Sequence, residues 1–216
     1  MQAALTDSLE ALQPVLTPLL AAYQAIDVDV GQEALFRYIR RDLFGFNDYL
    51  LFIVTLALAH SVPYYSINIF HTLLGWAFPK QVEKYRWCEG KHASSKLVRE
   101  CILFVTAYHI LAPIAPIFLY EYCANWNPTM MTAPVPGIVT CILQIPLAYL
   151  VTDFLFYWGH RLLHWGPLYK AVHKKHHEFY VTVGWACEYA HPVEFIMGNV
   201  IPVIAGPILF RYHHFM

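Results

Sequence analysis

The sequence predicts an all-α integral membrane protein, a helical bundle that carries a histidine-rich helical cap on its cytosolic side. Three observations support this fold class. The chain is 58% hydrophobic and only 13% charged, whereas soluble domains carry about 25% charged residues. Several apolar runs are as long as the roughly 20 residues that a membrane-spanning helix needs. Histidines also recur at helical spacing within residues 153–191.

Residues 1–45 are predicted to form an interfacial segment, followed by a membrane-embedded domain over residues 46–216. Pro14 and Pro18 interrupt a leucine pattern near the start. Residues 33–44 read as an amphipathic helix at the membrane surface, or equally as an ordinary surface helix, with arginines on the polar side. We expect no cleaved signal peptide, because a basic n-region and a small-residue cleavage site are missing.

Residues 46–79 form a long apolar run that Pro63 and Asn68 divide. One long kinked span fits this run, and so does a span followed by an interfacial segment. His60 and His71 lie within it. We expect both to be packed, hydrogen-bonded side chains rather than ligands, although ionisable groups inside a membrane often mark functional sites.

The next segments predict a helical hairpin. Residues 100–122 and 137–158 are apolar and long enough to span, and the turn at 123–136 contains no Lys or Arg. The loop at 80–99 is rich in basic residues, as is the histidine-rich run, so the positive-inside rule places both in the cytosol. Residues 193–210 give a further apolar segment that spans or re-enters the membrane.

Two histidine clusters dominate the stretch from Asp153 to His191, which holds six of the twelve histidines. They read HRLLH at 160–164 and HKKHH at 173–177, and Gly166-Pro167 between them would end the first helix. On an α-helix, residues at i, i+3 and i+4 share one face, so each cluster would present a convergent patch of imidazoles.

Packed imidazoles favour a metal site, because charged rings repel each other and buried neutral rings each need a partner. A transition metal takes the nitrogen lone pairs. The alternative is two amphipathic faces that happen to carry histidine. Five or six histidines exceed the ligand set of one zinc ion and predict more than one metal ion. The predicted ligands are His160, His164, His173, His176 and His177, with His191 weaker because it could instead cap the next segment.

Two further residues near the first cluster are candidate catalytic residues. Asp153 and Tyr157 lie seven and three residues before His160, on or near the same helix stripe. A carboxylate there could fix the tautomer of a ligand imidazole; the alternative is a carboxylate at the membrane interface. Glu178 and Glu188 are weaker candidates for this role, and Arg161 could pair with one of them. The five cysteines have no CxxC spacing, which argues for free thiols and against an iron–sulfur site.

These motifs resemble the sterol desaturase and fatty acid hydroxylase superfamily of membrane non-haem di-iron oxygenases, and within it the C-4 methylsterol monooxygenases. The residues that carry the resemblance are HRLLH, HKKHH with Glu178, Asp153-Phe154, Phe156–Arg161, Val172, and Glu188-Tyr-Ala-His-Pro-Val-Glu194. Family members continue to a third histidine-rich region. The pair His213-His214 lacks that pattern and reads as an interfacial element, so we expect the chain to be incomplete at its C terminus.

The resemblance implies an O2-dependent oxygenase that hydroxylates the 4-methyl group of sterols in the endoplasmic reticulum membrane. It implies two iron ions held by the histidines, and electrons from NAD(P)H delivered through cytochrome b5 or its reductase. The sterol would enter from the lipid bilayer. A net charge of −1 gives no reason to expect a nucleic-acid partner. Two alternatives stay open: a fatty-acid or sphingolipid hydroxylase or sterol C-5 desaturase, and a truncated non-catalytic protein that binds metal or lipid.

Overall fold

The computed structural model describes residues 30–86, 88, 90–111 and 113–214, and all regular structure among them is helical. The elements are α2 (Val30–Tyr38), η1 (Ile39–Leu43), α3 (Asp48–Ala77), α4 (Pro79–Lys84), α5 (Ser95–Leu111), α6 (Ile114–Trp126), α7 (Ile138–Leu163), α8 (Gly166–Ala171), η2 (His173–Glu178), η3 (Gly184–Glu188), α9 (Pro192–Glu194), η4 (Phe195–Val200) and α10 (Ile201–Leu209). The all-α prediction is confirmed for these residues; the predicted pattern around Pro14 and Pro18 lies outside them.

Four helical segments of the described chain are long and apolar enough to cross a membrane: Asp48–Ala77, Ser95–Trp126, Ile138–Leu163 and Pro192–Leu209. The first is one continuous helix that contains Pro63, which favours the single-span interpretation of residues 46–79. The predicted span at 100–122 falls on α5 and α6, and Pro113 is the N-cap residue of α6. The last segment is long enough to span rather than only to re-enter.

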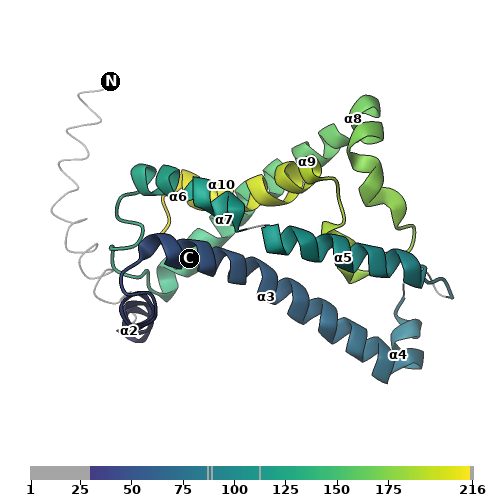
Figure 1. Cartoon of the computed structure of the whole chain (residues 1–216), viewed down its shortest axis with the longest axis horizontal. Coiled ribbons are helices and arrows are strands. Elements are labelled where there is room, and N and C mark those ends of the chain that lie inside the picture. The colour runs from purple at the N-terminus through teal and green to yellow at the C-terminus, as the bar shows by residue number, and fades with distance from the viewer. Residues whose placement is uncertain (1–29, 87, 89, 112, 215–216) are drawn as a thin grey trace.

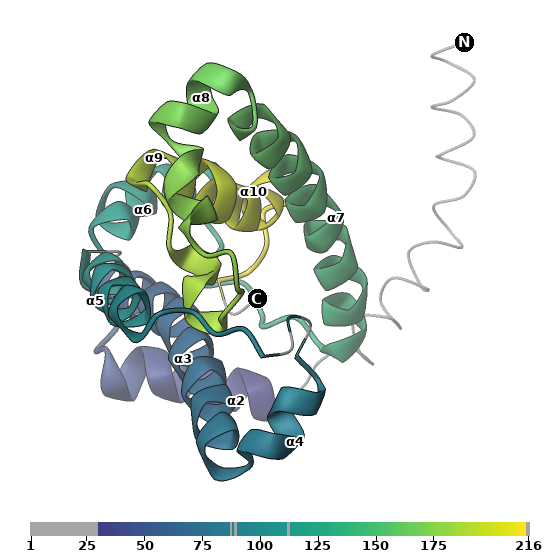
Figure 2. The same cartoon turned by 90° about the vertical axis from the view of Figure 1, so that its right-hand side faces the viewer.

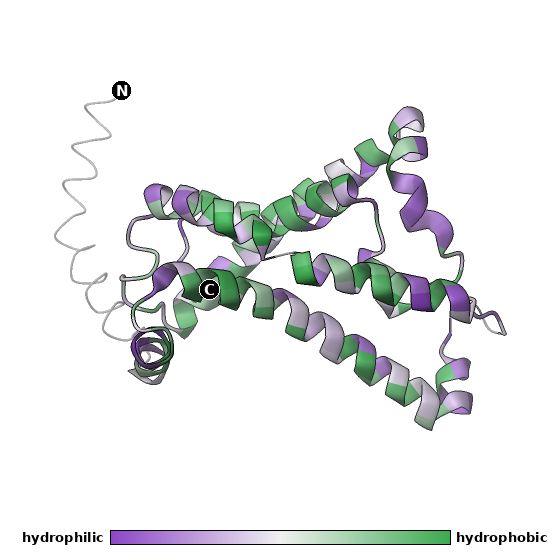
Figure 3. Ribbon diagram, in the orientation of Figure 1, coloured by the Kyte–Doolittle hydropathy of each residue, from purple (hydrophilic) through white to green (hydrophobic). Residues whose placement is uncertain are grey.

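The polar connections gather at two opposite ends of the bundle (Figure 1). The loop after α3, the start of α5, and the α8–η2 segment lie at one end, whereas α2 and the α6–α7 connection lie at the other. Figure 3 shows hydrophilic residues on α8, η2 and α4, and hydrophobic residues along the middle of the long helices. The basic loop and the histidine-rich run therefore share one end, as the predicted hairpin requires.

A close helix pair links α7 and α10. A Cβ added at Gly206 would lie 2.8 Å from the Cα of Ala148, so only glycine lets the two backbones approach this closely. Thr152 strengthens the contact, since its hydroxyl donates to the carbonyl of Pro202 at 3.0 Å. This crossing fixes the position of the α9–α10 segment against the helix that carries the first histidine cluster.

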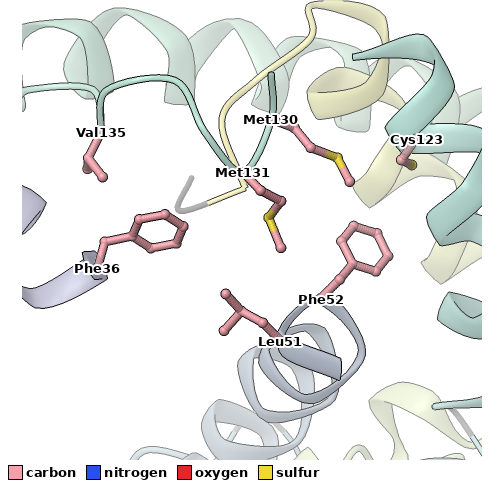
Figure 4. Close-up of a cluster of buried hydrophobic side chains, with 7 residues drawn as sticks. All are labelled: Phe36, Leu51, Phe52, Cys123, Met130, Met131 and Val135. Atoms are coloured by element: carbon pink, nitrogen blue, oxygen red, sulfur yellow. The ribbon is translucent and has the colours of Figure 1, made fainter. Parts of the chain in front are cut away.

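Two apolar clusters hold the described helices together. At the α2 end, Phe36 and Leu51 pack with buried side chains of α3, α6 and the α6–α7 connection (Figure 4). The second cluster seats η3 against α3 and α5, and contains Tyr64, Cys101 and Val105. The hydroxyl of Tyr64 and the thiol of Cys101 both donate to the carbonyl of Trp185. Cys101 is therefore a packing residue, and all five cysteines are free thiols, as expected.

The predicted amphipathic helix at 33–44 becomes α2 and a π-helical turn, η1, docked on the bundle. Glu33 accepts a hydrogen bond from the backbone N–H of Val135 at 2.7 Å, and Phe36 is buried. Arg40 does not lie on a free polar face, because its guanidinium makes two hydrogen bonds to Asp48 at 2.6 and 2.8 Å. The segment is thus attached to the start of α3.

Candidate metal centre

Four histidine rings from α7 and η2 converge on one point. His160 lies in the last turn of α7, His164 is its C-cap, and His173 and His177 come from η2. The Nε2 atoms of His160 and His164 are 3.1 Å apart, those of His164 and His173 are 3.1 Å apart, and those of His173 and His177 are 2.9 Å apart. One ligand atom from each of the four rings lies within 4.8 Å of all the others.

The backbone that presents the second cluster differs from the prediction. HKKHH was expected on an α-helix, but it forms a 3-10 helix, His173–Glu178. Gly166-Pro167 does end the first helix as predicted, because α7 stops at Leu163 and Pro167 opens the short helix α8. Figure 2 shows α8 and the following segment running down between α7 and α5. The chain therefore reverses between His164 and His173, and the two clusters face each other.

Glu194 orients the central ring. Its Oε1 lies 2.6 Å from Nδ1 of His173, and both residues are buried. A carboxylate at this distance accepts the Nδ1 hydrogen, so the neutral ring directs the lone pair of Nε2 toward His164 and His177. Burial, followed by the charges of neighbouring rings, lowers the pKa of His173 to about 3. Burial also lowers the pKa of His177. Both rings are therefore neutral at pH 7, the state that binds metal.

The spacing of the four nitrogens fits a metal ion. Four ligands at about 2.1 Å from a tetrahedral ion lie about 3.4 Å from each other, close to the three separations of 2.9–3.1 Å found here. Neutral rings can satisfy only part of this set by hydrogen bonding, because each has one N–H and Nδ1 of His173 already donates to Glu194. The donor set is thus suited to one transition-metal ion such as iron or zinc.

The other two predicted ligands hold backbone groups instead. Nδ1 of His176 lies 3.3 Å from the carbonyl oxygen of Tyr189, and its ring borders the four-histidine centre, 5.6 Å from that of His177 between centroids. His191 is the N-cap of α9, where its Nδ1 accepts from the N–H of Val193 at 3.2 Å. This capping arrangement is the alternative that the His-Pro sequence offered.

The structure brings Glu194, rather than Asp153, to a ring of the centre. Asp153 is exposed on α7, and within the described chain no hydrogen bond joins it to a histidine; its catalytic role stays a prediction. Tyr157 is also exposed, and its hydroxyl accepts from Arg161 at 2.7 Å. Among the described residues, Arg161 makes no ion pair with Glu178 or Glu188, the pairing that the sequence left open. Glu178 accepts from the hydroxyl of Tyr189 instead, and Glu188 lies near His60 and His109.

Sequence reasoning assigned no role to Glu194, although a signal was present. The residue begins an apolar segment, and an ionisable group inside such a segment needs a partner. The terminal pair His213-His214 lies away from the centre. The ring of His213 donates a hydrogen bond to the carbonyl of Ala133, and the ring of His214 is hydrogen-bonded to the hydroxyl of Thr55. Both contacts lie at the end of the bundle where α3 begins, opposite the centre (Figure 1). Neither ring supplies a ligand to the four-histidine centre.

Both histidine clusters lie in the part of the chain that matches a known protein family. Residues 145–216 match the fatty acid hydroxylase family model. Over this region, the chain is similar to the fatty acid hydroxylase family, and its relatives support the sterol desaturase and fatty acid hydroxylase superfamily. The matched region contains all five histidines on which the metal prediction chiefly rested: His160, His164, His173, His176 and His177.

Three superfamily relatives illustrate the similarity. A C-4 methylsterol oxidase of Candida albicans is 32% identical over 185 residues, which make up 82% of this chain and 56% of the relative. Methylsterol monooxygenase erg25B of Aspergillus fumigatus is 34% identical over 127 residues, 59% of this chain and 43% of the relative. Fatty acid hydroxylase domain-containing protein 2 of Homo sapiens is 37% identical over 97 residues, 45% and 29% of the two chains. The chain spans less than two thirds of each relative, and no solved structure gives a significant match.

Proposed function

We propose that the chain carries the metal-binding part of an O2-dependent membrane oxygenase that hydroxylates the 4-methyl group of a sterol. The observation that supports an oxygenase is the convergence of four ring nitrogens from α7 and η2, with the central ring held by Glu194. The choice of a 4-methylsterol rests on the names of the relatives from Candida albicans and Aspergillus fumigatus. It also rests on the resemblance carried by the stretch Glu188–Glu194.

His160, His164, His173 and His177 would hold one of the two iron ions that the superfamily implies, and His176 is the next nearest ring. Iron bound there would supply the activation of O2 that an unactivated C–H bond requires, with one oxygen atom entering the substrate and the other leaving as water. Glu194 keeps Nδ1 of His173 protonated, so that Nε2 stays available to the metal. We propose Asp153 and Tyr157 as accessory residues on the same helix.

An apolar groove gives a lipid substrate a route along α7. Its volume is about 830 Å³, within the range of small-molecule sites. It lies between α6, α7 and α10, and its walls include Trp126, Leu150, Phe154 and Ile204. Phe154 precedes His160 by six residues, or about 9 Å along a helix. A substrate in this groove would approach the centre from the bilayer rather than from water.

The proposed orientation places the four-histidine centre on the cytosolic face of the endoplasmic reticulum membrane. The end of the bundle that holds this centre also carries basic residues of the α4–α5 loop and of η2, such as Lys91 and Lys174. Basic residues favour the cytosolic side. Electrons would then come from NAD(P)H through cytochrome b5 or its reductase, which work at that face.

The test is product formation in membranes that contain the whole chain. Membranes supplied with NAD(P)H, O2 and either labelled 4,4-dimethylsterol or labelled fatty acyl lipid would be analysed by mass spectrometry. We expect an oxygenated 4-methyl carbon in the sterol, lost in His173→Ala and kept in His71→Ala, which removes an exposed histidine of α3. Oxidation of the fatty acyl lipid alone would replace the sterol proposal with the fatty-acid hydroxylase alternative. Iron binding without any product would favour the non-catalytic alternative.

A further inference from the structure

A second group of ligand-type side chains lies apart from the four-histidine centre. His60 comes from α3, His109 from α5 and Glu188 from η3. One ligand atom from each lies within 4.8 Å of the other two. Three separate elements therefore bring two imidazoles and one carboxylate to the same place, in a part of the bundle where charged groups are costly unless they are paired.

Both imidazoles face the same carboxylate oxygen. Nε2 of His109 is 3.0 Å from Oε2 of Glu188, and Nε2 of His60 is 3.4 Å from it. The two rings stack with centroids 4.5 Å apart and planes 17° apart. Ligands at about 2.1 Å from a tetrahedral ion are separated by about 3.4 Å. The two nitrogen–oxygen distances are thus close to the distances between neighbouring ligand atoms around a bound metal ion.

His109 is held by a hydrogen bond of the kind that orients metal-binding histidines. Nδ1 of His109 lies 2.8 Å from the hydroxyl of Ser61, which can fix the ring so that Nε2 points at Glu188. The side chain of His109 is only 4% exposed and that of Glu188 only 14% exposed. A buried carboxylate needs a positive charge nearby, and a divalent ion would supply it.

Hydrogen bonding alone does not account for the ring of His60. Its Nε2 is buried and has no hydrogen-bond partner among the described residues, although Glu188 is within ion-pair distance. A buried ring nitrogen without a partner lowers the stability of the fold. A metal ion held by His109 and Glu188 would use this nitrogen as its third ligand.

We propose that His60, His109 and Glu188 form a mononuclear site for a divalent transition-metal ion, separate from the four-histidine centre. Two histidines and one carboxylate are a ligand set found for zinc and for non-haem iron, and the set leaves at least one coordination position open. Aromatic rings of Tyr64 and Phe195 pack against His109 and His60, respectively. This proposal does not depend on the reaction proposed above.

The test uses the whole chain in detergent with the four-histidine centre disabled by His173→Ala and His177→Ala. After removal of metal with a chelator, the protein is titrated with Co²⁺, and the bound ion is measured by its visible d–d absorption and by elemental analysis. We expect one equivalent of Co²⁺ with a low-coordinate spectrum. Ser61→Ala should weaken its binding by about 10–100-fold, because Ser61 only orients a ligand. Absence of bound Co²⁺ in this parent protein would overturn the proposal.

Ligand variants in the same background locate the ion. Glu188→Gln and His60→Gln keep the size of the side chain and should remove the equivalent of Co²⁺. The matched controls Glu121→Gln and His71→Ala change an exposed acid and an exposed histidine and should leave the binding unchanged. Helical circular dichroism checks that each variant is folded. If Glu188→Gln and His60→Gln are folded and still bind Co²⁺ as the parent does, the assignment is wrong.

Discussion

Oε1 of Glu194 lies 2.6 Å from Nδ1 of His173, although 21 residues separate the two in sequence. The carboxylate fixes the tautomer of the ring that stands at the middle of the four-histidine centre. We therefore expect Glu194→Ala to weaken metal binding at this centre by about 10–100-fold. The measurement is the metal retained per chain after dialysis against a graded series of chelators. Glu121→Gln is the control, and equal retention in Glu194→Ala and the unaltered protein would contradict the role of Glu194.

Two neighbouring histidines are expected to differ in importance. His177 belongs to the four-nitrogen group, whereas His176 turns its Nδ1 to the carbonyl of Tyr189. His177→Ala should remove a ligand and lower the metal content sharply, while His176→Ala should retain more metal than His177→Ala. Elemental analysis of the two purified variants gives the comparison. The reverse order would show that the 3-10 geometry of η2 does not describe the metal-bound state.

A pH effect is expected at the terminal segment, where burial, followed by the charge of His213, lowers the pKa of His214 to about 4. The ring has a pKa of about 6.5 in an unfolded chain. Between these values the unfolded chain binds more protons, so the free energy of unfolding falls as the pH drops from 6.5 to about 4. The slope is up to about 1.4 kcal/mol per pH unit. His214→Gln cannot titrate and should show a smaller loss between pH 7 and pH 5.

Denaturation of metal-free protein in detergent at the two pH values measures this difference. His173 contributes to the acid sensitivity of both proteins, so its effect cancels in the comparison. Above pH 6.5 the ring is neutral in both states, and the two proteins should differ only by a constant. Identical pH dependence of the unaltered protein and His214→Gln would refute the assignment.

Glycines in two helices are expected to respond with opposite sign to the same substitution. Gly206→Ala places a Cβ 2.8 Å from the Cα of Ala148, and overpacking of this kind costs about 1–3 kcal/mol. Gly75→Ala meets nothing within 4 Å and should stabilise α3 by up to about 1 kcal/mol, because alanine favours a helix. Thermal unfolding followed by circular dichroism distinguishes the two. A neutral Gly206→Ala would mean that α7 and α10 are not in contact as described.

The proposed orientation can be tested with single cysteines at the two ends of the bundle. Lys91 and Thr129 are both exposed and lie in connections on opposite sides. In a background with Cys88 and Cys187 changed to Ser, a membrane-impermeant maleimide should label Lys91→Cys in sealed microsomes whose cytosolic face is outward. Thr129→Cys should be labelled only after permeabilisation. Labelling in the opposite order would invert the proposed topology.

Much of the fold followed from patterns that the sequence displays directly. Apolar length predicted the spans, charge placed the 80–99 loop with the histidine-rich run, and helical spacing brought His160 and His164 together. The convergence of the two clusters was also predictable, because Gly166-Pro167 forces a reversal between them. Local patterns could not show that η2 is a 3-10 helix, since this depends on how His173 and His176 are held by Glu194 and Tyr189.

The contacts that sequence reasoning missed are long-range. Asp153 was preferred as the supporting carboxylate because it lies on the same helix as His160, whereas Glu194 reaches His173 only after the chain has folded back. His109 carried no local signal at all, and His60 was expected to be a packed residue. The two histidines meet Glu188 only when α3, α5 and η3 lie side by side, and spacing within a single helix cannot predict this arrangement.

The stretch from Glu188 to Glu194 links the His60–His109 pair to the four-histidine centre along the chain. Its first residue faces His60 and His109, and its last residue holds His173. Between them, the carbonyl of Ala190 accepts from the hydroxyl of Tyr108 at 2.9 Å, so the stretch is anchored to α5. Because the two glutamates share one short stretch, their substitutions are expected to be non-additive in a double-mutant cycle.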